Sequence, residues 1–105
     1  MSRETIRVIA RLQAKPGKAD ELRSLAAALL APTRREAGCT RYELLENDAE
    51  PAELTFVEEW QDGTVLNAHL ATAHVQSELS RCPDLLVGEI DLRRFIRVGS
   101  ARKRS

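Results

Sequence analysis

The stretch EEWQDGTVLNAHLATAH, residues 58–74, contains the only tryptophan of the chain, Trp60, and both of its histidines, His69 and His74. An imidazole titrates near neutral pH and can therefore take a proton from a substrate. Flat side chains such as Trp60 and Tyr42 can position an aromatic ring. We predict that His69 accepts a proton and that Trp60 and Tyr42 lie beside it. In the structural alternative, His69 bonds to backbone or faces solvent and both aromatic rings belong to the core.

Three further residues, Phe56, Asn67 and His74, are predicted to contact a substrate. Phe56 would contribute its ring and Asn67 a hydrogen bond to a substrate oxygen, although a solvent-facing asparagine is the commoner case. His74 follows His69 by five positions, which is about 140° around a continuous helix, so the two rings share a face only if the helix breaks. This spacing also differs from that of the usual paired-histidine zinc site.

Glu58 is expected at the same site, because strand alternation places it on one face with Phe56 and Trp60. An unpaired charge on an apolar face is costly. We therefore expect an arginine partner for Glu58 rather than a role as general base. The candidates are Arg7, Arg11 and Arg41.

No metal or cofactor site is predicted. Cys39 and Cys82 form no C-x-x-C pair and have no histidine at metal-ligand spacing. The sequence has no glycine-rich phosphate loop. We expect a colourless protein that works without added metal or flavin.

Composition predicts a single soluble, cytoplasmic domain. The 105 residues include 16 basic and 16 acidic ones, and this balance argues against a nucleic-acid partner. No apolar run approaches the ~18 residues of a membrane span, so no membrane association is expected. We assign residues 1–98 to the domain and residues 99–105, with Arg102, Lys103 and Arg104, to a basic C-terminal tail.

Hydrophobic periodicity predicts the order βαββαβ, the ferredoxin-like arrangement of the α+β class. Pro32 is expected to kink the first helix, and Thr72 could cap a second segment of the other helix. Two helices on one face leave the opposite face of the sheet bare, which favours a homodimer through that face. We expect strands at 4–14, 39–46, 54–60 and about 85–98, and helices at 19–38 and 64–80.

Three motifs follow one another along the chain: EAGCTRYEL (36–44), FVEEW (56–60) and AHLATAH (68–74). Together they resemble the antibiotic biosynthesis monooxygenase (ABM) family, which includes small quinol monooxygenases. The resemblance covers about residues 5–97. It implies a dimeric α/β barrel, in which the sheets of two subunits face each other and each subunit keeps a pocket between sheet and helices. The resemblance also implies that six residues match those usual at the corresponding positions of the family: Gly38, Tyr42, Glu58, Trp60, His69 and His74.

The activity that the resemblance implies is cofactor-independent oxidation of a quinol or polyhydroxylated aromatic by O2. Triplet oxygen reacts slowly with closed-shell molecules, so the deprotonated substrate must supply the electron. Such a site needs a dry apolar pocket and a proton acceptor. The haem-degrading branch is disfavoured, because Leu79 stands near the position of its axial histidine.

Two alternatives remain open at this level. One is a non-enzymatic small-molecule-binding or stress-related dimer with the same pocket. The other is a cofactor-free isomerase that uses the histidine as a proton shuttle. Family and fold alone do not decide between them.

Overall fold

The computed structural model describes residues 4–101, so the predicted basic residues 102–104 lie outside the described part of the chain. Within residues 4–101, no helix is long and apolar enough to cross a membrane. The elements, in chain order, are β1 (Ile6–Gln13), α1 (Ala19–Ala27), α2 (Leu30–Arg34), β2 (Cys39–Glu46), β3 (Glu53–Trp60), α3 (Gly63–Leu70), α4 (Ala73–Arg81), the 3-10 turn η1 (Cys82–Asp84) and β4 (Asp91–Ile96).

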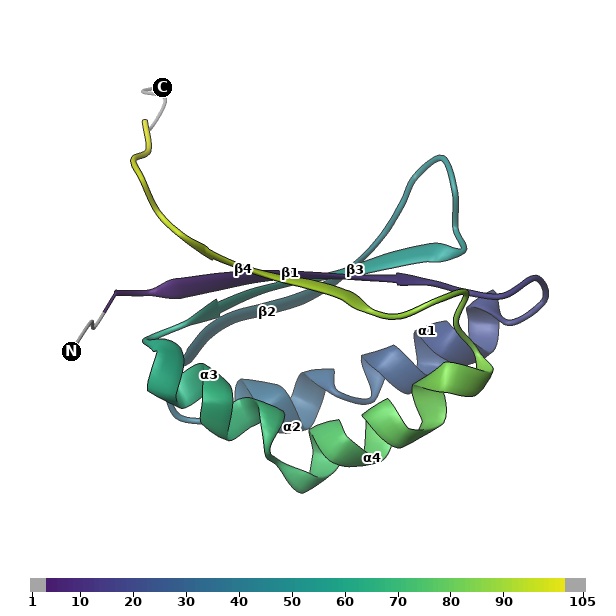
Figure 1. The fold of residues 1–105 in the computed structure, drawn as a ribbon, viewed down its shortest axis with the longest axis horizontal. Helices are drawn as coiled ribbons and strands as arrows, with labels where there is room; N and C mark the ends of the chain where they lie inside the picture. The colour runs from purple at the N-terminus through teal and green to yellow at the C-terminus, as the bar shows by residue number, and fades with distance from the viewer. Residues whose placement is uncertain (1–3, 102–105) are drawn as a thin grey trace.

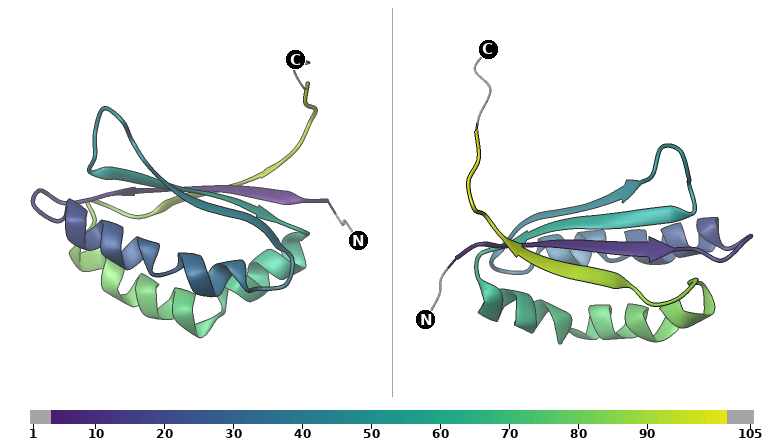
Figure 2. Two further views of the ribbon diagram at one scale, coloured as in Figure 1. Left: turned by 180° about the vertical axis from the view of Figure 1, so that it is seen from behind. Right: turned by 45° about the horizontal axis from the view of Figure 1, so that its top comes forward.

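The four strands form one antiparallel sheet in the order β2-β3-β1-β4. All four α-helices lie on the same side of this sheet, with α1 and α2 beneath one half and α3 and α4 beneath the other (Figures 1 and 2). This two-layer arrangement is the predicted ferredoxin-like α+β fold.

Strand alternation explains where the core lies. The residues of β1 and β3 that point toward the helices are buried and include Val8, Leu12, Leu54 and Trp60. Tyr42 of β2 joins them, whereas Thr40, two residues earlier, is exposed. A bulge between Cys39 and Arg41 shifts the register, and the Thr40 hydroxyl bonds to Glu59 instead.

Both predicted helices are divided, each for a local reason. Pro32 lacks an N–H, and its ring crowds the carbonyl four residues earlier, so α1 ends at Ala27 and a new segment begins at Leu30. Thr72 is the N-cap of α4, with its hydroxyl oxygen accepting a bond from the Val75 N–H. These breaks let two short helix pairs curve beneath the sheet.

The last strand begins later than predicted. Leu86 makes an isolated bridge with Ala14, and both Leu85 and Leu86 are buried. Gly88 then adopts a positive φ of 75°, which turns the chain before β4 starts at Asp91. The apolar run at 85–90 therefore belongs to the core and to a turn rather than to the strand.

Candidate active site

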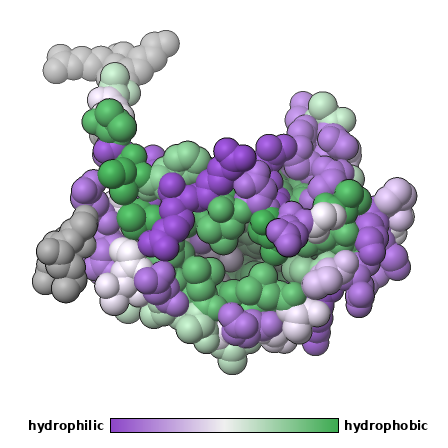
Figure 3. Space-filling view, viewed as in Figure 1, coloured by the Kyte–Doolittle hydropathy of each residue, from purple (hydrophilic) through white to green (hydrophobic). Residues whose placement is uncertain are grey.

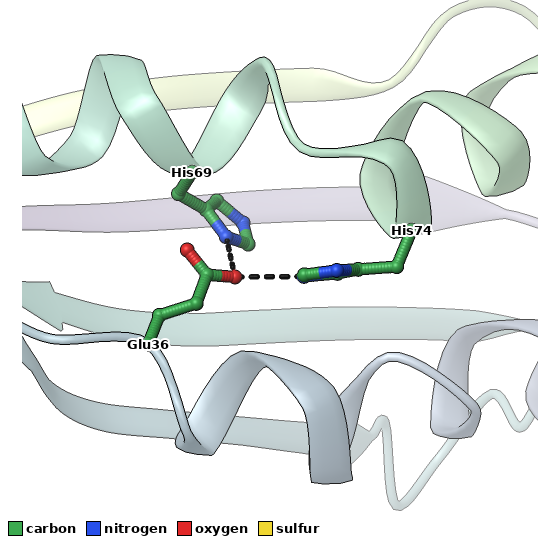
Figure 4. Close-up of side chains that lie close together, drawn as sticks. All are labelled: Glu36, His69 and His74. Carbon is green, nitrogen blue, oxygen red and sulfur yellow. Dashed lines mark hydrogen bonds and ion pairs between the residues drawn. The ribbon is translucent and has the colours of Figure 1, made fainter.

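One carboxylate oxygen joins the two histidines of the chain. Glu36 Oε2 lies 2.8 Å from His69 Nδ1 and 2.7 Å from His74 Nε2 (Figure 4). An ionised carboxylate only accepts hydrogen bonds, so both ring nitrogens act as donors here. A protonated Nδ1 leaves Nε2 as the free acceptor on a neutral His69 ring.

The break between α3 and α4 makes this convergence possible. The α3 helix ends at Leu70, and the side chain of Thr72 both caps α4 and donates to the His69 carbonyl at 2.7 Å. The 140° separation expected on a continuous helix therefore does not apply. His74 approaches the carboxylate from the first turn of α4, while His69 approaches it from the last turn of α3.

Glu36 reaches the site from the loop between α2 and β2. Gly38, two residues later, has a φ of 86°, which favours glycine, and a Cβ there would lie 2.6 Å from Val65 Cγ1 of α3. Glycine thus lets the loop pass directly against α3. That close approach brings Glu36 within hydrogen-bond distance of a residue 33 positions away.

Aromatic side chains enclose the His69 ring. Its centroid lies 4.3 Å from that of Trp60 and 5.6 Å from that of Tyr42, and His69 is only 2% exposed. Burial lowers the pKa of His69, although the carboxylate of Glu36 opposes that shift. The ring is therefore held neutral near pH 7, the state in which it can accept a proton.

A cavity of about 90 Å³ lies between the sheet and the helices, and His69 forms part of its wall. Tyr42 and Phe56 border it from the sheet, and most of the remaining lining is aliphatic. In Figure 3, apolar side chains surround a hollow on this face of the molecule. Leu79 of α4 and Leu92 of β4 are about two-fifths exposed and belong to this lining.

Glu58 also borders the cavity, and its partner is not an arginine. The indole N–H of Trp60 donates to Glu58 Oε1 at 2.9 Å. The predicted arginines pair elsewhere: Arg7 with Glu59, Arg11 with Glu53 and Arg41 with Glu43. They cannot reach Glu58 because they project from the opposite face of the sheet. Burial raises the pKa of Glu58 to about 7.

The other predicted site residues fall into two groups. Tyr42 and Phe56 line the cavity with their ring centroids 5.1 Å apart, and burial raises the pKa of the Tyr42 hydroxyl. Trp60 is fully buried and supports His69 from outside the cavity lining. Asn67 also lies outside the lining, and its side-chain oxygen accepts a 3.5 Å bond from Arg94.

Glu36 is the site residue that sequence reasoning missed. It opens the motif EAGCTRYEL, yet it lies in a loop, where no periodicity indicates the direction of a side chain. The signal available was its place two residues before a glycine at the start of a strand. Only the packing of that loop against α3 shows which residues it meets.

Comparison with known proteins shows which sequences resemble this chain. The sequence profile described as "Antibiotic biosynthesis monooxygenase" matches residues 5–77. The Bacillus subtilis protein YcnE, named as a candidate monooxygenase, is 32% identical over 81 residues, which are 77% of this chain and 85% of YcnE. An uncharacterized Synechocystis protein is 28% identical over 86% of this chain, which spans only 61% of that relative.

Solved structures agree with the sequence comparisons. Protein SO0527 from Shewanella oneidensis superposes with a TM-score of 0.86 at 32% identity, covering 91% of this chain and 93% of the other. Rv0793 from Mycobacterium tuberculosis superposes with a TM-score of 0.87 at 28% identity, covering 93% and 99%. The profile match, the relatives and the shared fold together show that this chain belongs to the antibiotic biosynthesis monooxygenase family.

Proposed function

We propose that this protein is a cofactor-independent monooxygenase that oxidises a quinol or polyhydroxylated aromatic with O2. The observation that carries the proposal is a buried, neutral His69 on the wall of an apolar cavity, with Glu36 bound to its Nδ1. A carboxylate that holds one ring nitrogen fixes the tautomer and leaves the other nitrogen as a base. Membership of a monooxygenase family supports the same reaction class.

The reaction balances without a further reductant. His69 takes the phenolic proton, and the phenolate passes one electron to O2, giving a phenoxyl radical and superoxide. The two recombine at a ring carbon that carries hydrogen, and the protonated His69 returns its proton to the peroxide. Loss of water from the resulting hydroperoxide leaves a carbonyl at that carbon. A phenol and O2 thus become a quinone and water, and each product contains one of the two atoms of O2.

The charges around the cavity favour a neutral substrate with hydroxyl donors. Two carboxylates, Glu58 and Glu78, belong to the lining, and the described lining residues include no lysine or arginine. Glu78 Oε2 is buried without a hydrogen-bond donor among the described residues. A phenolic hydroxyl could donate to it, whereas a carboxylate or phosphate on the substrate would be repelled.

The size of the cavity bounds the substrate. The cavity measures about 90 Å³. An apolar cavity of ~150 Å³, engineered into another protein, binds benzene, so the present cavity is smaller than one that holds a single ring. A bicyclic ring would therefore extend into the mouth beside Leu79 and Leu92, or α4 would move outward. We expect dihydroxybenzenes and dihydroxynaphthalenes to be better substrates than larger fused rings.

Oxygen consumption on a dihydroxynaphthalene tests the function, after subtraction of the uncatalysed autoxidation rate. His69→Ala should lower turnover by about 10²-fold, within the range of a lost general base. His74→Ala is the matched histidine variant and should cost less than about 10-fold, because Glu36 still holds His69. Activity should persist in the presence of a chelator.

Three outcomes would contradict the proposal. Equal rates for wild type and His69→Ala would remove His69 from the chemistry. Ligand binding without oxygen uptake would favour a binding protein, and conversion of a ligand without oxygen uptake would favour an isomerase.

We also propose that the protein is a homodimer formed through the sheet face opposite the helices. That face carries Ile9, Val57, Leu45 and Phe95, and the last two side chains are 48% exposed. Arginines and carboxylates that form ion pairs with each other surround these residues, so charges of both signs are available to match a second copy of the same face. Residues 97–101, which follow β4, rise on this same side (Figure 1).

Light scattering at micromolar concentration tests the dimer. It should give about twice the 11.7 kDa mass of the chain. Phe95→Glu, which places a charge in the proposed contact, should shift the protein toward monomer. A wild-type monomer would contradict the dimer.

A further inference from the structure

The ring nitrogens of two histidines and a carboxylate oxygen point at one place in this molecule. The ligand atoms of Glu36, His69 and His74 all lie within 4.8 Å of one another. Among the described residues, the ion pairs of Glu36 are with these two histidines. From this cluster we propose that the three residues form a binding site for a divalent cation of the zinc class.

The donor set matches what such a cation requires. Zn²⁺ is bound by histidine nitrogen at about 2.0–2.1 Å and by carboxylate oxygen at about 2.0–2.2 Å, and two histidines with one glutamate are an established three-ligand set. In a tetrahedral site, those bond lengths separate neighbouring ligand atoms by about 3.4 Å. Glu36 Oε2 lies somewhat closer than that to each nitrogen, whereas the two nitrogens lie up to 4.8 Å apart. The carboxylate must therefore withdraw slightly, and the His74 ring must approach His69.

The surroundings allow that small adjustment. Glu36 lies in a loop, so its side chain can rotate without disturbing a helix or strand. His69 is held on one side by the Trp60 ring and provides a fixed ligand. The His74 side chain is 29% exposed and the Glu36 side chain 17%, so a hydrated cation can approach from solvent.

Charge supports the same occupant. Two neutral imidazoles and one carboxylate carry a single negative charge, which a divalent cation more than offsets. Binding would replace the two N–H donors on Glu36 Oε2, because each coordinating nitrogen must release its proton. With only three protein ligands, a fourth position remains for water.

Cation binding would change the chemistry of His69. A metal on Nδ1 leaves the ring proton on Nε2, which turns the free ring nitrogen from an acceptor into a donor. The same residue cannot then serve as the base proposed above. The cation site does not rest on the proposed oxidation, since it follows from ligand geometry alone.

Metal titration of the full chain, free of any purification tag and treated with chelator, tests the site. We expect one Zn²⁺ per chain by calorimetry, with a Kd on the order of micromolar or below. Co²⁺ should give the intense visible absorption of a four-coordinate ion. Zn²⁺ should also raise the melting temperature, because the three ligands meet only in the folded chain, which should therefore bind the ion more tightly.

Variants locate the cation. His74→Ala and Glu36→Gln should each weaken Zn²⁺ binding by at least ~10-fold and abolish the rise in melting temperature. Both change residues that are less buried than His69, so the fold should persist. Glu50→Gln, which alters an exposed loop carboxylate, should bind as wild type does. Absence of stoichiometric binding to the wild type, or equal binding by the wild type and both site variants, would overturn the proposal.

Discussion

Replacing Glu58 by glutamine should stabilise the fold by an amount that grows with pH. The Glu58 side chain is 5% exposed, and burial raises its pKa from an ordinary 4.5 to about 7. Glutamine keeps the shape and the oxygen that accepts from the Trp60 indole, but it cannot ionise. The variant therefore removes the cost of placing a charge beside the cavity.

The sign follows from proton binding in the two states. Between pH 4.5 and about 7, the folded protein holds the Glu58 proton more tightly than the unfolded chain does, so rising pH lowers the free energy of unfolding. Each pKa unit corresponds to about 1.36 kcal/mol, so the full penalty above pH 7 is about 3 kcal/mol. At pH 5 the penalty is below about 1 kcal/mol. The gain from Glu58→Gln should thus increase by about 2–3 kcal/mol between pH 5 and pH 9.

Urea unfolding at pH 5, 7 and 9, followed by the fluorescence of Trp60, measures this gain. Trp60 is the only tryptophan and is fully buried in the fold, so its emission reports unfolding directly. Protein concentration must be equal in all samples, because a dimer gains stability with concentration. His69 titrates in the same range with the opposite sign, but its effect cancels between wild type and variant.

Glu59→Gln on the same strand is the matched control. Its carboxylate bonds to Thr40 and Arg7, which lower its pKa, so removing the charge should reduce stability at neutral pH. A gain from Glu58→Gln that does not depend on pH would refute the argument. So would a loss of stability at pH 9, because it would show that the folded state favours the ionised carboxylate.

The remaining predictions concern residues that hold the site in place. Gly38→Ala should destabilise the fold by about 1–3 kcal/mol, because φ is positive and the new Cβ meets Val65; chemical denaturation measures it, and an unchanged midpoint would contradict it. Thr72→Ala should cost about 1 kcal/mol through the lost cap of α4 in the same assay. Trp60→Ala should cost about 3–5 kcal/mol in that assay, whereas Trp60→Phe should retain the fold. Because Trp60 packs against His69, which lines the cavity, Trp60→Phe should weaken ligand binding indirectly, as titration with a dihydroxynaphthalene would show. Turnover that depends on neutral His69 should persist below pH 6.5, because burial lowers the pKa of this residue. A pH–rate profile measures this.

Much of this fold could be read from the sequence, because burial follows a period of two in strands and 3.6 in helices. Alternation in 4–14 and 54–60 identified the faces of β1 and β3, including the place of Glu58 beside Trp60. Pro32 and Thr72 marked helix breaks because both act on the adjacent backbone. Local chemistry of this kind needs no knowledge of distant contacts.

The meeting of His69 and His74 on Glu36 was decided by tertiary structure alone. It depends on the direction in which α4 leaves Thr72 and on how closely the Gly38 loop passes α3, and neither has a sequence period. The partner of Glu58 was missed for a related reason. Charge alone favoured an arginine, but the pleat of the sheet places Arg7, Arg11 and Arg41 on the other face. The buried carboxylate of Glu58 therefore accepts from the Trp60 indole, which lies on its own side.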